Sequence, residues 1–239
     1  NVWGLAPGHW RQTITTGNET IVRHFDALWR ERVRHRYDST NPAGTSVFTE
    51  TRYDHRGNST FVSYPSRSFV EVDVAKPGRR TVYDALGRVI QTTQDSELGE
   101  LHTVTRYLGP GFKREVTDPR GHVTTYSFQA FDTPSEDSIR RIEMPHGVLV
   151  RIDRDIFGKA TAITREGPYG GSTLSATRRY VYDLYQRLCK TIEPETGATI
   201  QAYDASGNVA WRASGLALTS QSACNQAEVA DSRKVYFGY

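Results

Sequence analysis

A six-residue pattern that returns seven times most constrains how this chain of 239 residues can fold. The pattern is an aromatic residue, Asp, two variable residues, Gly, and a basic or amide residue. Three clear copies carry Asp54 with Gly57, Asp84 with Gly87, and Asp204 with Gly207. Weaker copies carry Asp118 with Gly121 and Asp155 with Gly158, and two further copies keep only Asp26 or Asp183. These seven positions give successive spacings of 28, 30, 34, 37, 28 and 21 residues.

The chemistry of the pattern predicts a tight turn in each copy. An Asp at the first position of a turn accepts hydrogen bonds from backbone N–H groups two to three residues later. A Gly three residues after it adopts the left-handed conformation and can form a bulge that starts the returning strand. Each copy is therefore a strand-turn-strand unit, and neighbouring units must stack because one unit cannot bury its own apolar face. We expect these Asp and Gly residues to be structural.

Composition supports an all-β fold. The chain has 26 Thr, 19 Val and 13 Tyr, which favour strands, and its 20 Gly and 10 Pro interrupt long helices. Three hairpins can be read directly, with arms at 12–15 and 20–23, 138–143 and 148–153, and 187–192 and 198–203. Residues 19–37 have helical spacing, but the match between the copies at Asp26 and Asp84 predicts strands there. One short helical insertion is expected near 220–231, which is rich in Ala, Gln and Glu.

The repeated Tyr-Asp-x-x-Gly-Arg/Asn turn resembles the YD repeat of Rhs proteins, teneurins and the C subunit of bacterial insecticidal toxin complexes. The resemblance extends from about Phe25 to Tyr239. It implies an all-β, antiparallel YD-repeat strip that forms an open, curved segment of a hollow shell. We therefore expect residues 1–239 to be a single repeat region and a fragment of a longer protein.

The resemblance also implies a function. Bacterial members of the family enclose a toxic C-terminal segment of the same chain, so the expected role is a non-catalytic structural part of such a shell. The expected partners are the remainder of its own shell and the enclosed toxin. The expected location is outside the producing bacterium, secreted or on the cell surface after export from a longer precursor. Open strand edges of the fragment invite self-association.

The sequence offers little for catalysis or cofactors. Its seven His residues do not fall at metal-ligand spacing, and no nucleophile elbow or phosphate-binding loop occurs. We expect no catalytic residue, no cofactor and no metal. The net charge of +3 comes from scattered charges, which argues against a nucleic-acid partner. No apolar run approaches the ~18 residues of a membrane span.

A different class of function remains open, namely a cell-surface module that binds carbohydrate or mediates adhesion. Its basis is the content of Trp and Tyr, whose rings could form a surface that stacks on sugars. Alternatively, these aromatic rings pack between the repeats and form the core. The residues concerned are the Tyr residues together with Trp3, Trp10, Trp29 and Trp211.

Cys189 and Cys224 are the only two cysteines, 35 positions apart. In a protein class that works outside the cell, two cysteines make a disulfide plausible, which would pin the segment near 220–231 to the sheet. The alternative is two separately buried, reduced thiols. Spacing alone does not decide between them.

Overall fold

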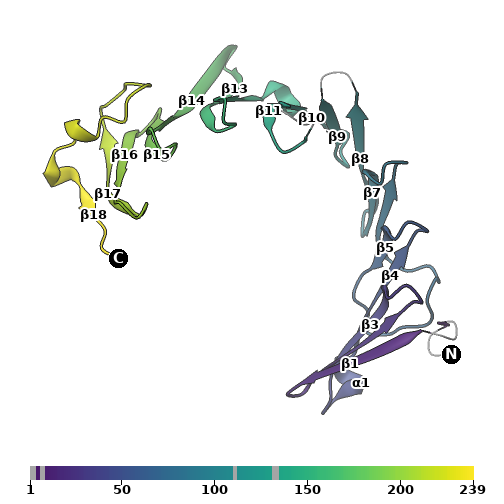
Figure 1. The fold of residues 1–239 in the computed structure, drawn as a ribbon. Coiled ribbons are helices and arrows are strands. Elements are labelled where there is room, and N and C mark those ends of the chain that lie inside the picture. The colour runs from purple at the N-terminus through teal and green to yellow at the C-terminus, as the bar shows by residue number, and fades with distance from the viewer. Residues whose placement is uncertain (1–3, 6–8, 110–111, 131–134) are drawn as a thin grey trace. The chain divides into compact units, whose positions relative to one another are not determined.

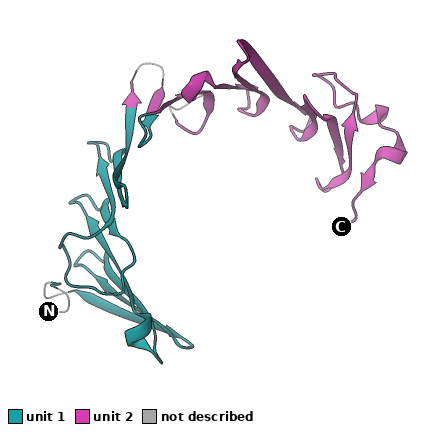
Figure 2. Ribbon diagram, turned by 180° about the vertical axis from the view of Figure 1, so that it is seen from behind, with its two compact units in different colours: residues 1–106, 116–121 teal, residues 107–115, 122–239 magenta. Residues whose placement is uncertain are grey.

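The computed structural model describes residues 4–5, 9–109, 112–130 and 135–239. The chain divides into two compact units, shown in different colours in Figure 2. The N-terminal unit comprises residues 1–106 and 116–121, and the C-terminal unit comprises 107–115 and 122–239. Within the described residues the structure is almost entirely antiparallel β-sheet, which confirms the predicted all-β class (Figure 1).

The strands of the N-terminal unit follow one another along the chain, and each pairs with the next. They are β1 (Trp10–Thr16), β2 (Glu19–Phe25), β3 (Glu31–Asp38), β4 (Val47–Tyr53), β5 (Ser59–Ser63), β6 (Gly78–Tyr83) and β7 (Val89–Ser96). Two further strands contribute residues to both units, β8 (Gly99–Leu108) and β9 (Lys113–Thr117).

The C-terminal unit repeats this arrangement of sequential antiparallel neighbours. Its strands are β10 (Val123–Phe128), β11 (Ile139–Glu143), β12 (Leu149–Arg154), β13 (Ala160–Tyr169), β14 (Ser172–Tyr182), β15 (Leu188–Glu193), β16 (Gly197–Tyr203), β17 (Val209–Leu216) and β18 (Val235–Tyr236). All three hairpins predicted from the sequence are present, as are the strands predicted within residues 19–37.

Helical structure is short. The four-residue helix α1 (Pro42–Thr45) connects β3 to β4, and the 3-10 turn η1 (Pro145–Gly147) connects β11 to β12. The helical insertion expected near 220–231 consists of two 3-10 turns, η2 (Gln226–Glu228) and η3 (Asp231–Arg233). An α-helix does not run through the segment because Asn225 adopts a left-handed φ of 54°, which interrupts helical geometry before η2.

The N-terminal unit buries a charge beneath the long β5–β6 connection, residues 64–77. Glu50 on β4 has no solvent exposure. Its Oε1 accepts hydrogen bonds from Arg52 Nε (2.7 Å) and the Asp73 backbone N–H (2.8 Å), and its Oε2 accepts one from Lys76 Nζ (2.5 Å). Burial alone would raise the pKa of Glu50, but the hydrogen bonds from Arg52 and Lys76 outweigh it and hold that pKa below its usual value. Glu50 therefore fastens this connection to the sheet.

The C-terminal unit has its apolar core under residues 217–234, which we call the C-terminal strap. Val229 of the strap packs on Ile200 of β16 and Ala213 of β17. Lys190 on β15 is almost completely buried, and its Nζ donates to Ser220 O (2.8 Å) and Asn225 Oδ1 (2.7 Å) of the strap. Burial lowers the pKa of Lys190. The strap thus covers both an apolar cluster and an ammonium group.

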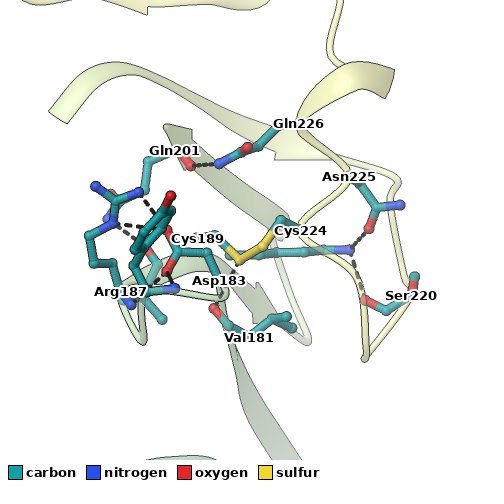
Figure 3. Close-up of a disulfide and its surroundings, with 12 residues drawn as sticks. Val181, Asp183, Arg187, Cys189, Gln201, Ser220, Cys224, Asn225 and Gln226 are labelled. Carbon is teal, nitrogen blue, oxygen red and sulfur yellow. Dashed lines mark hydrogen bonds and ion pairs between the residues drawn. A yellow bond between two sulfur atoms is a disulfide. The ribbon is translucent and has the colours of Figure 1, made fainter. Parts of the chain in front are cut away.

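A disulfide joins the sheet to this strap (Figure 3). Cys189 and Cys224 have Cα atoms 5.4 Å apart, and Cys189 is completely buried. One residue further along each segment, Lys190 contacts Asn225, so two consecutive residues of β15 hold two consecutive residues of the strap. The Gln226 side chain adds a hydrogen bond from Nε2 to Gln201 O (2.7 Å).

We predict that Cys224→Ser destabilises the C-terminal unit by about 4 kcal/mol, the chain-entropy value for a closed loop of this length. Cys224 is the residue to change because it is partly exposed, whereas Cys189 is buried. Urea unfolding with and without a reductant measures the effect. Wild-type protein should lose the same stability in reductant, and the variant should not respond to reductant. Equal stability of oxidised and reduced wild type would contradict the prediction.

Candidate functional site

The seven Asp positions form turns of one geometry. At Asp84 the backbone N–H donates to Arg88 O (2.9 Å), and the Gly87 N–H donates back to Asp84 O (3.0 Å). The Asp84 Oδ1 atom accepts the N–H groups of Leu86 and Arg88, and its Oδ2 accepts Arg88 Nε. One carboxylate thereby satisfies three donors within its own turn. Corresponding backbone bonds occur at Asp26, Asp54, Asp155, Asp183 and Asp204.

The residue three positions after each Asp has a left-handed backbone. Five copies place Gly there, and φ ranges from 78° at Gly87 to 89° at Gly57. The copies that lack Gly keep the same conformation, with φ of 60° at Trp29 and 63° at Gln186. These two side chains occupy a region that costs most residues about 1–2 kcal/mol. The geometry of the turn is therefore kept even where a residue other than Gly must adopt a positive φ.

A β-bulge follows each of six turns at a fixed distance. After Asp183, Tyr182 pairs with Leu188 and Val181 pairs with Lys190, which leaves Cys189 as the extra residue. The extra residue always lies six positions after Asp. The six are Arg32, Thr60, Ile90, Thr161, Cys189 and Ala210. This bulge explains how the adjacent residues Cys189 and Lys190 both reach the strap.

The aromatic residue of the pattern connects neighbouring copies. The Tyr203 hydroxyl donates to Leu188 O (2.8 Å), five positions after the preceding Asp183. The same five-residue offset is kept by three other tyrosines, namely Tyr53 to Glu31 O, Tyr83 to Ser59 O, and Tyr182 to Ala160 O. Each hydroxyl therefore fixes one copy against the backbone of the copy before it.

The basic residue that ends the pattern also reaches the next copy. Arg187 stacks on the Tyr203 ring at 4.5 Å, and Arg30 stacks on the Tyr53 ring at 4.9 Å. Arg30 Nη1 also donates to Asp54 O (3.0 Å). In the Asp54 copy, which ends in Asn58, Arg56 at a variable position of the pattern donates to Ala85 O in the following turn. In the C-terminal unit, Lys159 Nζ donates to Gln186 O (2.6 Å). Side chains of one turn thus hold the backbone of the next.

The turn at Asp118 departs from this series in the number of strands that follow it. Its Gly121 N–H donates to Asp118 O (3.0 Å), as in the other copies. However, the three strands β10, β11 and β12 separate it from the Asp155 turn, whereas two strands separate Asp155 from Asp183. The additional strand accounts for the long spacing of 37 residues between Asp118 and Asp155 in the sequence.

Comparison with known proteins identifies no family model and no curated protein that matches the chain. Solved structures do match. Tc toxin chains are among the matching structures. The crystal structure of TcdB2-TccC3-TEV is 12% identical with a TM-score of 0.48, and the match covers 89% of this chain and 14% of that one. The crystal structure of TcdB2-TccC3 is 13% identical with a TM-score of 0.49, covering 86% and 13%.

A third match is the Tc holotoxin pore of Photorhabdus luminescens, at 12% identity and a TM-score of 0.48, covering 87% of this chain and 13% of that one. The chain therefore spans about a seventh of the length of these Tc toxin chains or less. Tc toxin complexes are also among the proteins that the Asp turns resemble in sequence. The family resemblance itself rests on the seven turns of the chain.

The described residues do not gather a set of metal ligands. Among them, no three His, Cys, Asp or Glu side chains are placed to hold a metal ion. The helices formed by the part of the chain that the structure describes all fall short of the length and apolarity of a membrane span. Trp3 lies outside the described residues, and Trp10 stacks on Trp29 at 4.8 Å with both rings half exposed or more.

The sequence predicted a bulge at the start of the returning strand, but neither its position six residues after Asp nor the hydrogen bonds between turns. The position of the bulge could have been predicted by counting six residues from Asp, because the length of the turn is constant. The Tyr-to-carbonyl bonds required knowledge of which strands pair, since Tyr and its acceptor are 15–24 residues apart. The Glu50 network had no signal in the sequence, because nothing marks this Glu as buried.

We predict that Asp183→Ala costs about 1 kcal/mol of unfolding free energy, the usual loss for a capping side chain. Asp183→Asn should cost less, because it keeps the Oδ1 acceptor for the N–H groups of Tyr185 and Arg187. Urea unfolding at neutral pH measures both. A suitable control is Glu195→Ala, because exposed Glu195 makes no hydrogen bond or ion pair within the described residues. Equal losses in Asp183→Ala and Glu195→Ala would contradict the role of the carboxylate.

The same turn should depend on pH. Burial raises the pKa of Asp183, but the backbone and side-chain hydrogen bonds from Arg187 outweigh it, so the pKa in the folded state is lowered. The stability that Asp183 contributes is therefore complete above its unfolded pKa of about 3.9 and is lost as pH falls through the lower folded value. Between about pH 5 and pH 2, the difference in stability between wild type and Asp183→Asn should shrink. A constant difference over this range would show that the charge is irrelevant.

We also predict that Gly87→Ala costs about 1–2 kcal/mol because φ is 78° there. The cost is purely conformational, since an added Cβ would meet no heavy atom within 4 Å. Gly109→Ala is the matched control, with the same open space and a φ outside the left-handed region. Thermal unfolding should show a lower midpoint for Gly87→Ala alone. Two equal midpoints would exclude a conformational penalty at Gly87.

Proposed function

We propose that this chain is a non-catalytic structural segment of an Rhs-type shell that encloses a C-terminal toxin of the same longer protein. The observation that carries the proposal is the set of seven turns with one geometry, of which four neighbouring pairs are linked by Tyr hydroxyls. Such links make a wall that extends by repetition.

The energetics of the turns suit a wall one sheet thick. A sheet that faces water or cargo on both sides buries little apolar surface, so its stability has to come from local contacts. The described turns supply these contacts through carboxylate capping and ring stacking. Hydrophobic clusters are confined to places where a connection covers the sheet, as under the C-terminal strap.

A non-catalytic role agrees with the state of the Asp carboxylates. Asp84 and Asp204 have lowered pKa values, chiefly because the backbone N–H groups of Arg88 and Asn208 donate to them. Such carboxylates stay ionised near neutral pH and have their oxygens committed to the turn, so they are poor general acids. The same holds for Asp183, which also pairs with Arg187.

We place the working protein outside the producing bacterium, either secreted or on its surface. The Cys189–Cys224 disulfide supports this location, because disulfides persist in oxidising surroundings. The partners that follow are the remaining shell of the same protein and the toxin within it. Bacterial origin and export from a longer precursor belong to the same proposal.

Limited proteolysis of the complete natural protein that contains this segment tests the role. We expect its C-terminal region to resist protease under native conditions and to be digested once mild denaturant opens the shell. Asp183→Ala in the complete protein should lower the denaturant concentration at which digestion begins. Glu195→Ala should leave that concentration unchanged.

Rapid digestion of the C-terminal region under native conditions would overturn encapsulation. If the complete protein also bound cells or glycans without protecting that region, an adhesion module would be the better description. The turn predictions are independent of this outcome, because they concern stability alone.

A further inference from the structure

An amine, an amide and a carboxylate are in contact between β15 and the C-terminal strap. Lys190 Nζ donates to Asn225 Oδ1 (2.7 Å), and Asn225 Nδ2 donates to Glu228 Oε1 (2.5 Å). These two bonds fix the orientation of the amide, because only its oxygen accepts from the amine and only its nitrogen donates to the carboxylate. The carbonyl carbon of Asn225 is one C=O bond from Oδ1, so it lies within ~4 Å of Lys190 Nζ. A nucleophile, an electrophile and a proton carrier thus lie side by side.

The surroundings of the Lys190 amine favour its neutral form. The side chain is 1% exposed, and Ser220 O (2.8 Å) and Asn225 Oδ1 both point toward its nitrogen (Figure 3). A neutral amine has two N–H groups for these two acceptors, whereas an ammonium has three. Burial lowers the pKa of Lys190, and the opposing charge of Glu228 only partly offsets this effect. A fraction of the amine is therefore neutral and has the lone pair that a nucleophile needs.

From this geometry we propose that Lys190 and Asn225 join through an isopeptide bond, an amide between their side chains. Lys190 Nζ attacks Asn225 Cγ with its lone pair and forms a new C–N bond. The Cγ–Nδ2 bond then breaks, and its electron pair leaves with the nitrogen as ammonia. No oxidant or reductant is consumed, because the step exchanges one amide for another. The reaction is a single self-modification and not an enzymatic turnover.

Glu228 moves the proton that this exchange requires. In the adduct both nitrogens are bonded to Cγ, so the carboxylate that accepts from Nδ2 is also close to Nζ. It takes one proton from Nζ and gives it to Nδ2, which makes the departing group ammonia. The second proton of the neutral amine stays on the new amide nitrogen. Glu228 is exposed, so the ammonia leaves on the solvent side of the site.

The neighbouring disulfide holds the two reactants together. Cys189 and Cys224 directly precede Lys190 and Asn225, and the Cα atoms of the two cysteines are 5.4 Å apart. Such tethering replaces a bimolecular encounter with a reaction between groups that are already in place. The amide closes the same loop one residue further along each segment, so in linked chains the strap stays on the sheet after reduction. The stability loss that we expect on reduction belongs to freshly folded chains, in which the amide has not yet formed.

Mass spectrometry of the wild-type chain tests the linkage. The folded protein is incubated at mildly alkaline pH, then reduced, alkylated and digested with trypsin. We expect the intact mass to fall by one ammonia molecule with time. We also expect the peptides 188–212 and 213–233 to remain joined after reduction and to be uncut after Lys190, because trypsin does not cleave after an acylated lysine. A chain that keeps the hydrogen bond without forming the amide gives neither result.

Three variants assign the roles of the side chains, after circular dichroism has established that each is folded. Glu228→Gln keeps an acceptor for Asn225 Nδ2 but carries no proton, so it should slow linkage by about 100-fold or more. Lys190→Arg should abolish linkage, because a guanidinium stays charged and is not a nucleophile. Glu195→Gln is the matched control and should link at the wild-type rate, because exposed Glu195 lies in the turn between β15 and β16.

The proposal is overturned if folded wild-type protein yields no joined peptides after prolonged incubation, or if Glu228→Gln links as fast as wild type. It is also overturned if ammonia is lost while the peptides stay separate, since cyclisation of an asparagine onto its own backbone gives the same change in mass. These outcomes leave the shell proposal untouched, because that proposal rests on protease protection of the C-terminal region.

Discussion

The Asp carboxylate at the start of each turn is the interaction on which the rest of the structure depends. Its two oxygens collect donors from the next four residues, which fixes the length of the turn. A fixed length places the left-handed residue three positions later and the bulge six positions later. It also sets the backbone carbonyl that the tyrosine of the following copy meets. A local contact within five residues therefore determines a contact between strands fifteen or more residues apart in the sequence.

The contacts within each turn and between neighbouring turns stabilise a sheet that is a single layer thick. Most globular domains pack two layers and draw their stability from the apolar contacts between them. Here many residues of β13 and β14 are at least partly exposed, and polar contacts such as the Thr164–Thr177 hydrogen bond occur across the strands. Two segments cover the sheet, the β5–β6 connection and the C-terminal strap. Each covers a buried charged residue of a strand, Glu50 on β4 and Lys190 on β15, and supplies hydrogen-bond partners to that residue.

The sequence predicted the local part of this structure well because the local part is encoded locally. Asp, Gly and the strand-favouring residues around them specify turn and hairpin without reference to distant contacts, so the strands on either side of Asp26 could be told from a helix. The covers could not be predicted in the same way. Glu50 and Lys190 are charged residues in strands whose surroundings depend on which connection folds over them. Composition also predicted a helix near Asn225, where docking onto the sheet imposes a different backbone.

The bulge gives six of the seven copies a position that departs from the alternation of a β-strand. In a regular strand the side chains alternate between the two faces of the sheet, and a register shift of one residue moves every side chain to the other face. The extra residue at the bulge has no partner in the ladder, so its identity can vary while the register is preserved. Cys189 uses that freedom to anchor a separate segment, and Thr60, Ile90, Thr161 and Ala210 occupy the equivalent place elsewhere. Six copies thus offer a position at which a peripheral segment can be attached to the sheet without a change of strand register.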